Sequence, residues 1–209
     1  MYTLNAISNY SYNLKIHGEH TTILYKAIKH ILKSAHISNG SLYFTAEKVS
    51  KFNPQNMATN HKQYIQLVDD LTQQMITLEK NNYAYYGFDI DMILTIDNHF
   101  IFCSTKYLEH IDNNRNINII YLDTRPYFSN PEIMKLTKLP SAINYKCGYY
   151  SLGILITYCI FKNYLLVANT IPEEKIINEV LYPIRDTKIY WFIKRCLQLD
   201  ISRRRILLV

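Results

Sequence analysis

The sequence contains little glycine and proline, and neither residue is clustered. Five glycines and six prolines occur among 209 residues, which excludes a collagen-like chain and a long flexible or proline-rich linker. Charged residues are also scarce, at 19%, whereas hydrophobic residues make up 48% of the chain. Because this composition supplies ample apolar material for a core, we predict a packed protein of one or two domains and exclude disorder as its main state.

Paired cysteines and metal-binding spacings are missing as well. The four cysteines are scattered, with no Cys-x-x-Cys pair, and the seven histidines show no spacing with cysteines or carboxylates that would build a zinc site. We therefore predict no structural metal, and free thiols buried in a reducing compartment. These thiols belong to Cys103, Cys147, Cys159 and Cys196.

No segment has the composition of a secretion signal or a membrane anchor. Residues 1–13 are polar and rich in tyrosine, without an apolar stretch behind positive charges. The longest apolar run, residues 149–161, is too short to cross a bilayer and is predicted to be a buried core helix. We expect an intracellular protein without membrane contact, in the cytoplasm of its own cell or of an infected host.

Positive charge is moderate and dispersed along the chain. Lys and Arg exceed Asp and Glu by 23 to 17, giving a net charge of +6, which favours polyanions in general. No helix-turn-helix, zinc-finger or RNP pattern accompanies the charge, so we do not expect specific nucleic-acid binding. We interpret the one dense run, Arg203 to Arg205, as a solvated helix end whose arginines complement the helix dipole.

The spacing of apolar residues predicts an α+β chain, with strands and one helix first and mostly helix afterwards. The expected strands or hairpins cover residues 2–16, 41–44, 92–96 and 100–103, and the expected helices cover residues 64–78, 149–161 and 187–199. A further helix is expected to begin at Thr21, in a segment closed by Asn39-Gly40. We expect a polar loop at residues 113–118, and a short helix that follows Asn130-Pro131-Glu132 and reaches Lys138.

Three motifs in the second half resemble those of the eukaryotic protein-kinase fold, in the order in which that family has them. Residues 128–132, Phe-Ser-Asn-Pro-Glu, are similar to the Ala-Pro-Glu element that ends a kinase activation segment. Residues 149–155 resemble the Trp-Ser-Leu-Gly start of the central buried helix, and residues 195–204 resemble the signature of the last helix. The resemblance covers residues 64–205 and implies a reduced N-terminal lobe at 1–60, followed by a kinase-like helical C-terminal lobe at 61–209.

The resemblance also implies an ion pair across the helical lobe. Glu132 would lie against Arg204, as the corresponding Glu and Arg of the family tie the activation segment to the end of the domain. A buried carboxylate needs such a partner, and a planar guanidinium supplies two parallel hydrogen bonds. Without the flanking motifs, the two residues would be interpreted as unrelated surface charges.

In the same register, the family's catalytic and metal-binding positions lack their charged groups. Gly87 stands at the catalytic Asp, Met92 at the metal-binding Asn, Cys103 at the Asp of Asp-Phe-Gly, and Gly148 at the Asp that braces the catalytic loop. No glycine-rich phosphate loop and no Val-Ala-Ile-Lys strand precede them. Because phosphoryl transfer depends on positioned charge, metal ions and a base, the resemblance implies no catalytic residues and no ATP or magnesium cofactor.

Three functions remain open at this point. The first hypothesis is a catalytically inactive, pseudokinase-like protein that binds another protein as a scaffold, decoy or regulator. The tyrosine-rich composition is typical of A+T-rich coding, as in many large DNA viruses, so we expect a viral origin. A third hypothesis, a structural virion component, would use the abundant tyrosines at interfaces. The sequence specifies neither the partner nor the oligomeric state.

The second hypothesis is a divergent phosphotransferase that uses ATP and magnesium. Asp89 or Asp91 would act as the base, and Asp97 would help to hold the metal. In a strand, Asp89 and Asp91 would point to the same side and could together hold a cation. The alternative for these residues is that they are turn and strand-entry aspartates that face the solvent.

Overall fold

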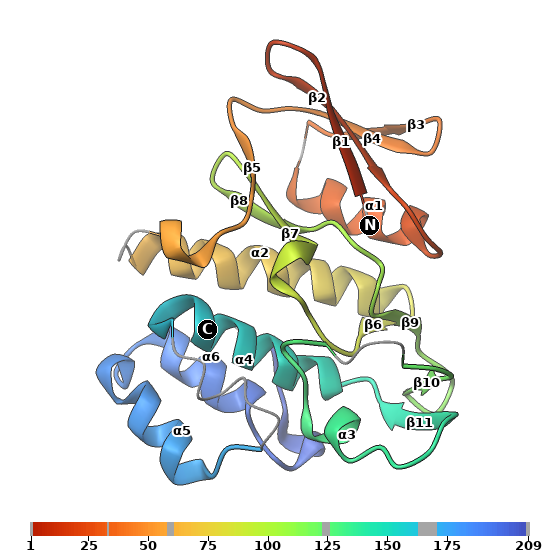
Figure 1. The fold of residues 1–209 in the computed structure, drawn as a ribbon. Coiled ribbons are helices and arrows are strands. Elements are labelled where there is room, and N and C mark those ends of the chain that lie inside the picture. Colours follow the sequence, from red (N-terminus) through yellow and green to blue (C-terminus); the bar gives the residue numbers. More distant parts are fainter. Residues whose placement is uncertain (1, 33, 58–60, 123–125, 163–170, 208–209) are drawn as a thin grey trace.

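The computed structural model describes residues 2–32, 34–57, 61–122, 126–162 and 171–207. The fold is mixed α+β, as predicted, with small antiparallel sheets and a set of packed helices (Figure 1). The division at residues 60 and 61 stays a prediction, and residues 58–60 beside it lie outside the described residues.

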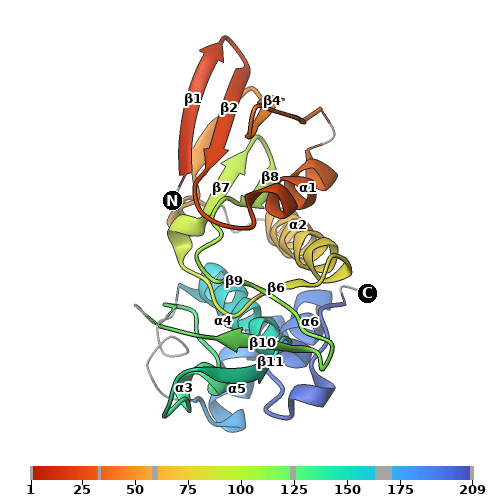
Figure 2. The ribbon, with the colours of Figure 1, turned by 90° about the vertical axis from the view of Figure 1, so that its right-hand side faces the viewer.

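A four-stranded antiparallel sheet forms the N-terminal part. Its strands follow the order β1-β2-β4-β3 and comprise β1 (Tyr2–Ser8), β2 (Ser11–Ile16), β3 (His36–Ser38) and β4 (Ser41–Thr45). The hairpin of β1 and β2 confirms the strands predicted at residues 2–16 and lies at one side of the molecule (Figure 2). Helix α1 (Thr21–Ile31) packs against α2 (His61–Lys80) and β8 (His99–Phe102), which joins the N-terminal part to the rest.

Asn39-Gly40 is a hairpin turn and does not close the first helical segment. Helix α1 ends at Ile31, and β3 follows before the turn. Ser38 pairs with Ser41, so the turn has two residues, and φ is positive at both Asn39 (47°) and Gly40 (68°). This conformation favours Asn-Gly and matches the twist of the two strands. The predicted boundary was wrong because Asn-Gly serves both as a helix end and as a hairpin turn.

The middle of the chain places a hairpin against the long helix α2. Strands β7 (Ile93–Ile96) and β8 form the predicted hairpin, β5 (Val49–Lys51) extends it, and η1 (Pro54–Asn56) leads into α2. The buried carboxylate of Asp70 on α2 accepts a hydrogen bond from the backbone of Phe100 at 2.9 Å. Gln74 accepts one from the backbone of Phe102 at 2.9 Å. Polar side chains of α2 therefore bind the backbone of β8 directly.

Helix α4 is the centre of the C-terminal part. The helices of this part are α3 (Pro131–Met134), α4 (Cys147–Phe161), α5 (Glu174–Leu181) and α6 (Lys188–Cys196), with short turns η4 (Tyr182–Ile184) and η5 (Ile201–Arg203). Leu155 and Ile156 of α4 are 0% exposed, which confirms the predicted buried core helix. Helix α3 ends before the predicted Lys138, α6 is shorter than predicted, and α5 was not predicted.

Two small sheets lie beside these helices. One pairs β6 (Tyr83–Tyr85) with β9 (Leu108–His110), and the other pairs β10 (Asn116–Ile119) with β11 (Ser141–Asn144). The predicted polar loop at residues 113–118 was therefore wrong in its second half. Ile117 and Ile119 are buried and Asn118 is exposed, the alternation of a half-buried strand.

The cysteines and the arginine run give one confirmation and one correction. All four cysteines are free and buried, as predicted. The run Arg203 to Arg205 is not uniformly solvated, because Arg204 is 0% exposed while Arg203 and Arg205 are exposed.

Among the residues that the structure describes, no helix combines the length and the apolar character needed to cross a membrane.

Candidate functional site

The candidate site is built around the central loop, which we define as residues 86–89, between β6 and η2 (Ile90–Met92). A second segment, residues 126–130, runs antiparallel to it and is called the covering segment. Phe128 donates a backbone hydrogen bond to Phe88 at 2.9 Å, and Phe88 donates one back at 3.3 Å. Both phenylalanines are 0% exposed. The covering segment therefore occupies one side of the central loop through its backbone.

Gly87 of the central loop packs against Pro126 of the covering segment. A Cβ atom at Gly87 would lie 2.2 Å from Cγ and 2.3 Å from Cβ of Pro126. Such distances are far inside van der Waals contact, so only glycine fits while Pro126 keeps its place. Pro126 is itself buried. The position at which the kinase resemblance expects a catalytic carboxylate is therefore filled by a proline ring.

Gly148 in the first turn of α4 packs against the end of β6, directly before the central loop. A Cβ atom there would lie 1.9 Å from the carbonyl oxygen of Tyr85. The obstacle is a backbone atom, which cannot rotate away as the end of a side chain can. The chain that enters the central loop thus rests directly on the helix, in the space that a bracing carboxylate would need.

Asn130 fixes the loop through neutral groups. Its side-chain amide donates hydrogen bonds to the carbonyl oxygen of Tyr86 at 2.6 Å and to Oγ of Ser151 on α4 at 3.0 Å. Its oxygen accepts from the backbone of Ile133 at 3.0 Å, which caps α3. Asn130 and Ser151 are both 0% exposed. One amide therefore connects the central loop, α3 and α4 without any charge.

Asp89 anchors the covering segment at the end of the central loop. One carboxylate oxygen accepts from Nζ of Lys106 and from the hydroxyl of Tyr107, each at 2.8 Å. The other oxygen accepts from the backbone of Tyr127 at 2.8 Å. Burial lowers the pKa of Lys106, but its hydrogen bonds with Asp89 and Tyr107 outweigh burial and raise that pKa overall. Both oxygens of the Asp89 carboxylate are therefore engaged within the fold.

The three aspartates of the phosphotransferase hypothesis do not lie as that hypothesis requires. Asp89 precedes η2 and Asp91 lies within it, so the expected strand with both side chains on one side was wrong. Asp97 lies in the turn at the far end of β7, a strand of four residues that spans about 13 Å. Its carboxylate accepts from the backbones of Glu47 at 2.9 Å and Lys48 at 2.8 Å.

A metal site is not formed by these residues. Within the described ranges, no group of three or more His, Cys, Asp or Glu side chains could hold a metal ion. Met92 and Cys103, at which the kinase resemblance expects metal-binding groups, are 1% and 0% exposed. Burial and the nearby Asp91 carboxylate raise the pKa of Cys103, so its thiol stays neutral.

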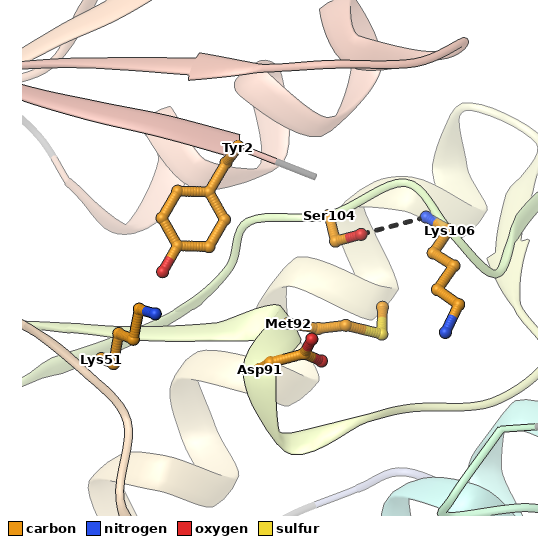
Figure 3. A pocket seen from close by; sticks show the side chains of 6 residues that line it. All are labelled: Tyr2, Lys51, Asp91, Met92, Ser104 and Lys106. Atoms are coloured by element: carbon orange, nitrogen blue, oxygen red, sulfur yellow. Dashed lines mark hydrogen bonds between the residues drawn. The ribbon is translucent and has the colours of Figure 1, made fainter.

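A cavity of about 440 Å³ opens between β1 and η2 (Figure 3). Tyr2 projects into it from β1, and Asp91 is the one carboxylate among the described residues that line it. The side chain of Lys106 runs away from Ser104, whose hydroxyl accepts the backbone hydrogen bond of Lys106 at 3.2 Å. The lining consists of Tyr2, Lys51, Asp91, Met92, Ser104 and Lys106.

The predicted pair of Glu132 and Arg204 is present. Two hydrogen bonds of 2.9 Å join Nη1 to Oε2 and Nη2 to Oε1. Arg204 also donates through Nε to the carbonyl of Gln198 at 2.7 Å and lies over the ring of Tyr150. Its side chain is 0% exposed, and that of Glu132 is 21% exposed. The pair therefore ties α3 to the end of the chain.

Asn130, Pro126 and the anchor at Asp89 were missed by sequence reasoning. Asn130 had a usable signal, because an Asn directly before Pro131 is typical of a helix N-cap. Pro126 and Asp89 had none, because each acts through a residue that is distant along the chain.

Comparison with known protein families finds no family model that matches the chain, and comparison with curated proteins finds no matching protein.

Proposed function

We propose that the protein is a catalytically inactive, protein-kinase-like protein that acts by binding another protein. The order of its elements supports the kinase-like interpretation. Helix α2, the central loop, the β7–β8 hairpin, α3 with Glu132, the buried helix α4 and finally Arg204 follow one another as the motifs require. The N-terminal sheet with helix α1 supports the interpretation of residues 1–60 as a reduced lobe.

The observation that carries the inactive interpretation is the contact of Gly87 with Pro126. A Cβ atom at Gly87 would lie 2.2 Å from the proline ring, so a carboxylate is excluded sterically as well as absent. Phosphoryl transfer draws most of its catalysis from positioned charge and metal ions. The central loop is fixed by the neutral amide of Asn130, and its one carboxylate, Asp89, is engaged within the fold as the anchor of the covering segment.

The competing phosphotransferase function receives less support from the same residues. Asp89 is occupied by Lys106, Tyr107 and the backbone of Tyr127. The carboxylate of Asp97 accepts hydrogen bonds from the backbone of the turn before β5, at Glu47 and Lys48. Of the three aspartates, only Asp91 lines the cavity, and a single carboxylate is the smallest ligand set with which proteins hold magnesium beside substrate phosphates.

Protein binding is supported by large apolar side chains that the chain leaves exposed near the covering segment. Ile120, Tyr121 and Tyr127 are 64%, 70% and 47% exposed, and they lie between β10 and α3 in the sequence. Aromatic residues at such positions are typical of protein interfaces, because they supply a large rigid surface at low entropic cost.

A thermal-shift titration with ATP tests the inactive function. We expect no change in Tm at millimolar ATP, with magnesium or manganese, because a ligand that binds the folded state must stabilise it by mass action. A metal-dependent rise of several degrees that Asp91→Ala removes would contradict the proposal. Asp186→Ala, which removes an exposed carboxylate outside the cavity, is the matched control.

Affinity capture from the producing cells tests protein binding. We expect at least one protein to be retained by the wild type and by Tyr182→Asp, which alters an apolar residue exposed elsewhere. The double variant Ile120→Asp with Tyr121→Asp should lose that protein. Retention by all three forms, or by none, would contradict binding at this segment. Stoichiometric abundance in purified particles would instead favour the structural virion function.

A further inference from the structure

The outer edge of β1 is an unpaired strand edge, and this feature does not depend on the proposed function. In the described part of the chain, β1 pairs only with β2, and it is the outermost strand of the four-stranded sheet (Figure 2). An open edge presents backbone N–H and C=O groups that can pair with another chain. Proteins commonly block such edges with charged residues or proline.

Strand β1 has almost none of these blocking features. Its sequence, Tyr-Thr-Leu-Asn-Ala-Ile-Ser, contains no charged residue and no proline. The one protective feature is a bulge at Ile7, because the register with β2 shifts between Ala6 and Ser8. The regular edge therefore covers five residues, from Tyr2 to Ala6.

The pattern of these five residues is symmetric about Leu4. Tyr2, Leu4 and Ala6 share one face of the strand, and Thr3 and Asn5 share the other. If two copies pair antiparallel about Leu4, Tyr2 lies opposite Ala6, Leu4 opposite Leu4, and Thr3 opposite Asn5. Apolar residues then face apolar residues, polar residues face polar ones, and no like charges meet.

We propose that two copies of this chain associate through β1, forming a continuous antiparallel sheet across a twofold axis. The other neighbours in the sheet are antiparallel already, so the new pair continues the same ladder. Tyr2 and Leu4, which are only partly buried against the core, become covered. Twofold dimers with one self-complementary patch are the commonest oligomers.

Sedimentation equilibrium over a wide range of protein concentration tests this proposal. The wild type is expected to form dimers. The variant Thr3→Lys with Asn5→Lys places like charges opposite each other twice and should raise the dimer Kd at least tenfold. Both residues are exposed, so the variant is expected to fold. The matched control, Asn113→Lys with Asn114→Lys, adds the same charge at an exposed turn and should dimerise as the wild type does.

A charge-reversal experiment identifies the occupant of the edge as a second copy in this register. Mixing the double lysine variant with Thr3→Glu, Asn5→Glu should restore dimers that contain one chain of each kind. A wild type that stays monomeric throughout would overturn the proposal. A lysine variant that dimerises normally, or a mixture that forms no mixed dimer, would overturn it too. Binding of β1 to a different protein alone would give the first of these results.

Discussion

Arg204 and Glu132, 72 positions apart in the chain, face each other in a two-pronged geometry, with both hydrogen bonds at 2.9 Å. The guanidinium is completely enclosed, and two further donors reach the backbone carbonyls of Gln198 and Lys146. Because Arg204 is 0% exposed, removing its carboxylate partner leaves a buried charge without compensation.

Glu132→Ala is therefore expected to lower the free energy of unfolding by about 3 kcal/mol. The value lies at the low end for a buried pair, because 21% of the Glu132 side chain stays exposed to water. Urea denaturation measures the change, and Glu47→Ala, at an exposed position, should stay within about 0.5 kcal/mol of the wild type. Equal stability of the two variants would contradict a structural role for the pair.

Gly148→Ala should destabilise the protein far more than Gly153→Ala on the same helix. The new methyl group at 148 would meet a backbone oxygen at 1.9 Å, whereas at 153 it would meet side-chain atoms of Cys196 and Leu197 at 2.8 and 2.9 Å. We expect a loss of about 3 kcal/mol or more at 148. Soluble yield and urea denaturation provide the comparison, and a reversed order would show that the loop does not rest on α4.

Asp89→Ala should release the covering segment while leaving the core intact. The variant removes the carboxylate that holds Lys106, Tyr107 and the amide of Tyr127. Hydrogen exchange in the peptide covering residues 126–130 should become faster, with a global loss of only about 1–2 kcal/mol. Asp91→Ala, at the exposed neighbouring carboxylate, should leave that exchange unchanged. Slow exchange in both variants would mean that Asp89 is not the anchor.

Stability should fall as the pH rises from about 4.5 to about 7, through Glu79. Burial raises the pKa of Glu79 to about 7, against the hydrogen bond from Tyr149 and the charges of Arg115 and Lys146. The folded protein thus holds this proton at a pH where the unfolded chain has released it, so the stabilisation is complete at low pH.

Glu79→Gln should flatten that pH dependence by at most about 3 kcal/mol. Asp70, whose pKa burial also raises, contributes in the same direction in both forms, so the difference between wild type and variant isolates Glu79. Urea denaturation at several pH values measures the difference. Parallel curves for the two proteins would exclude Glu79 as the source.

Elements with strong local signals were predictable from the sequence. The periodicity of α2, the long apolar run of α4 and the apolar, β-prone stretches of the β7–β8 hairpin are set by side chains within each segment, so the sequence alone indicates them. Strand β10 has a local signal too, the alternation Asn-Ile-Asn-Ile. The prediction gave more weight to the preference of Asn for turns, and so it placed a loop there. Its partner β11 lies beyond α3, so the pairing depends on the course of the whole chain.

Some contacts of the candidate site were predictable from the sequence and others were not. Glu132 and Arg204 could be paired because flanking motifs define both positions. Asp89 and Tyr127 could not, because they are 38 positions apart and meet only after the covering segment has folded over the central loop. The proline against Gly87 is equally invisible in sequence, since a small residue in a loop has many explanations.

The two tight glycine contacts also bear on how this chain can evolve. A mutation that introduced a carboxylate at position 87 or 148 would first have to displace Pro126 or the backbone of Tyr85. Each single step toward a carboxylate at either position therefore passes through a less stable protein, and proteins near their stability threshold do not tolerate such steps. The packing therefore keeps glycine at both positions. Substitutions there are opposed by their cost in stability, whether or not selection also acts on binding.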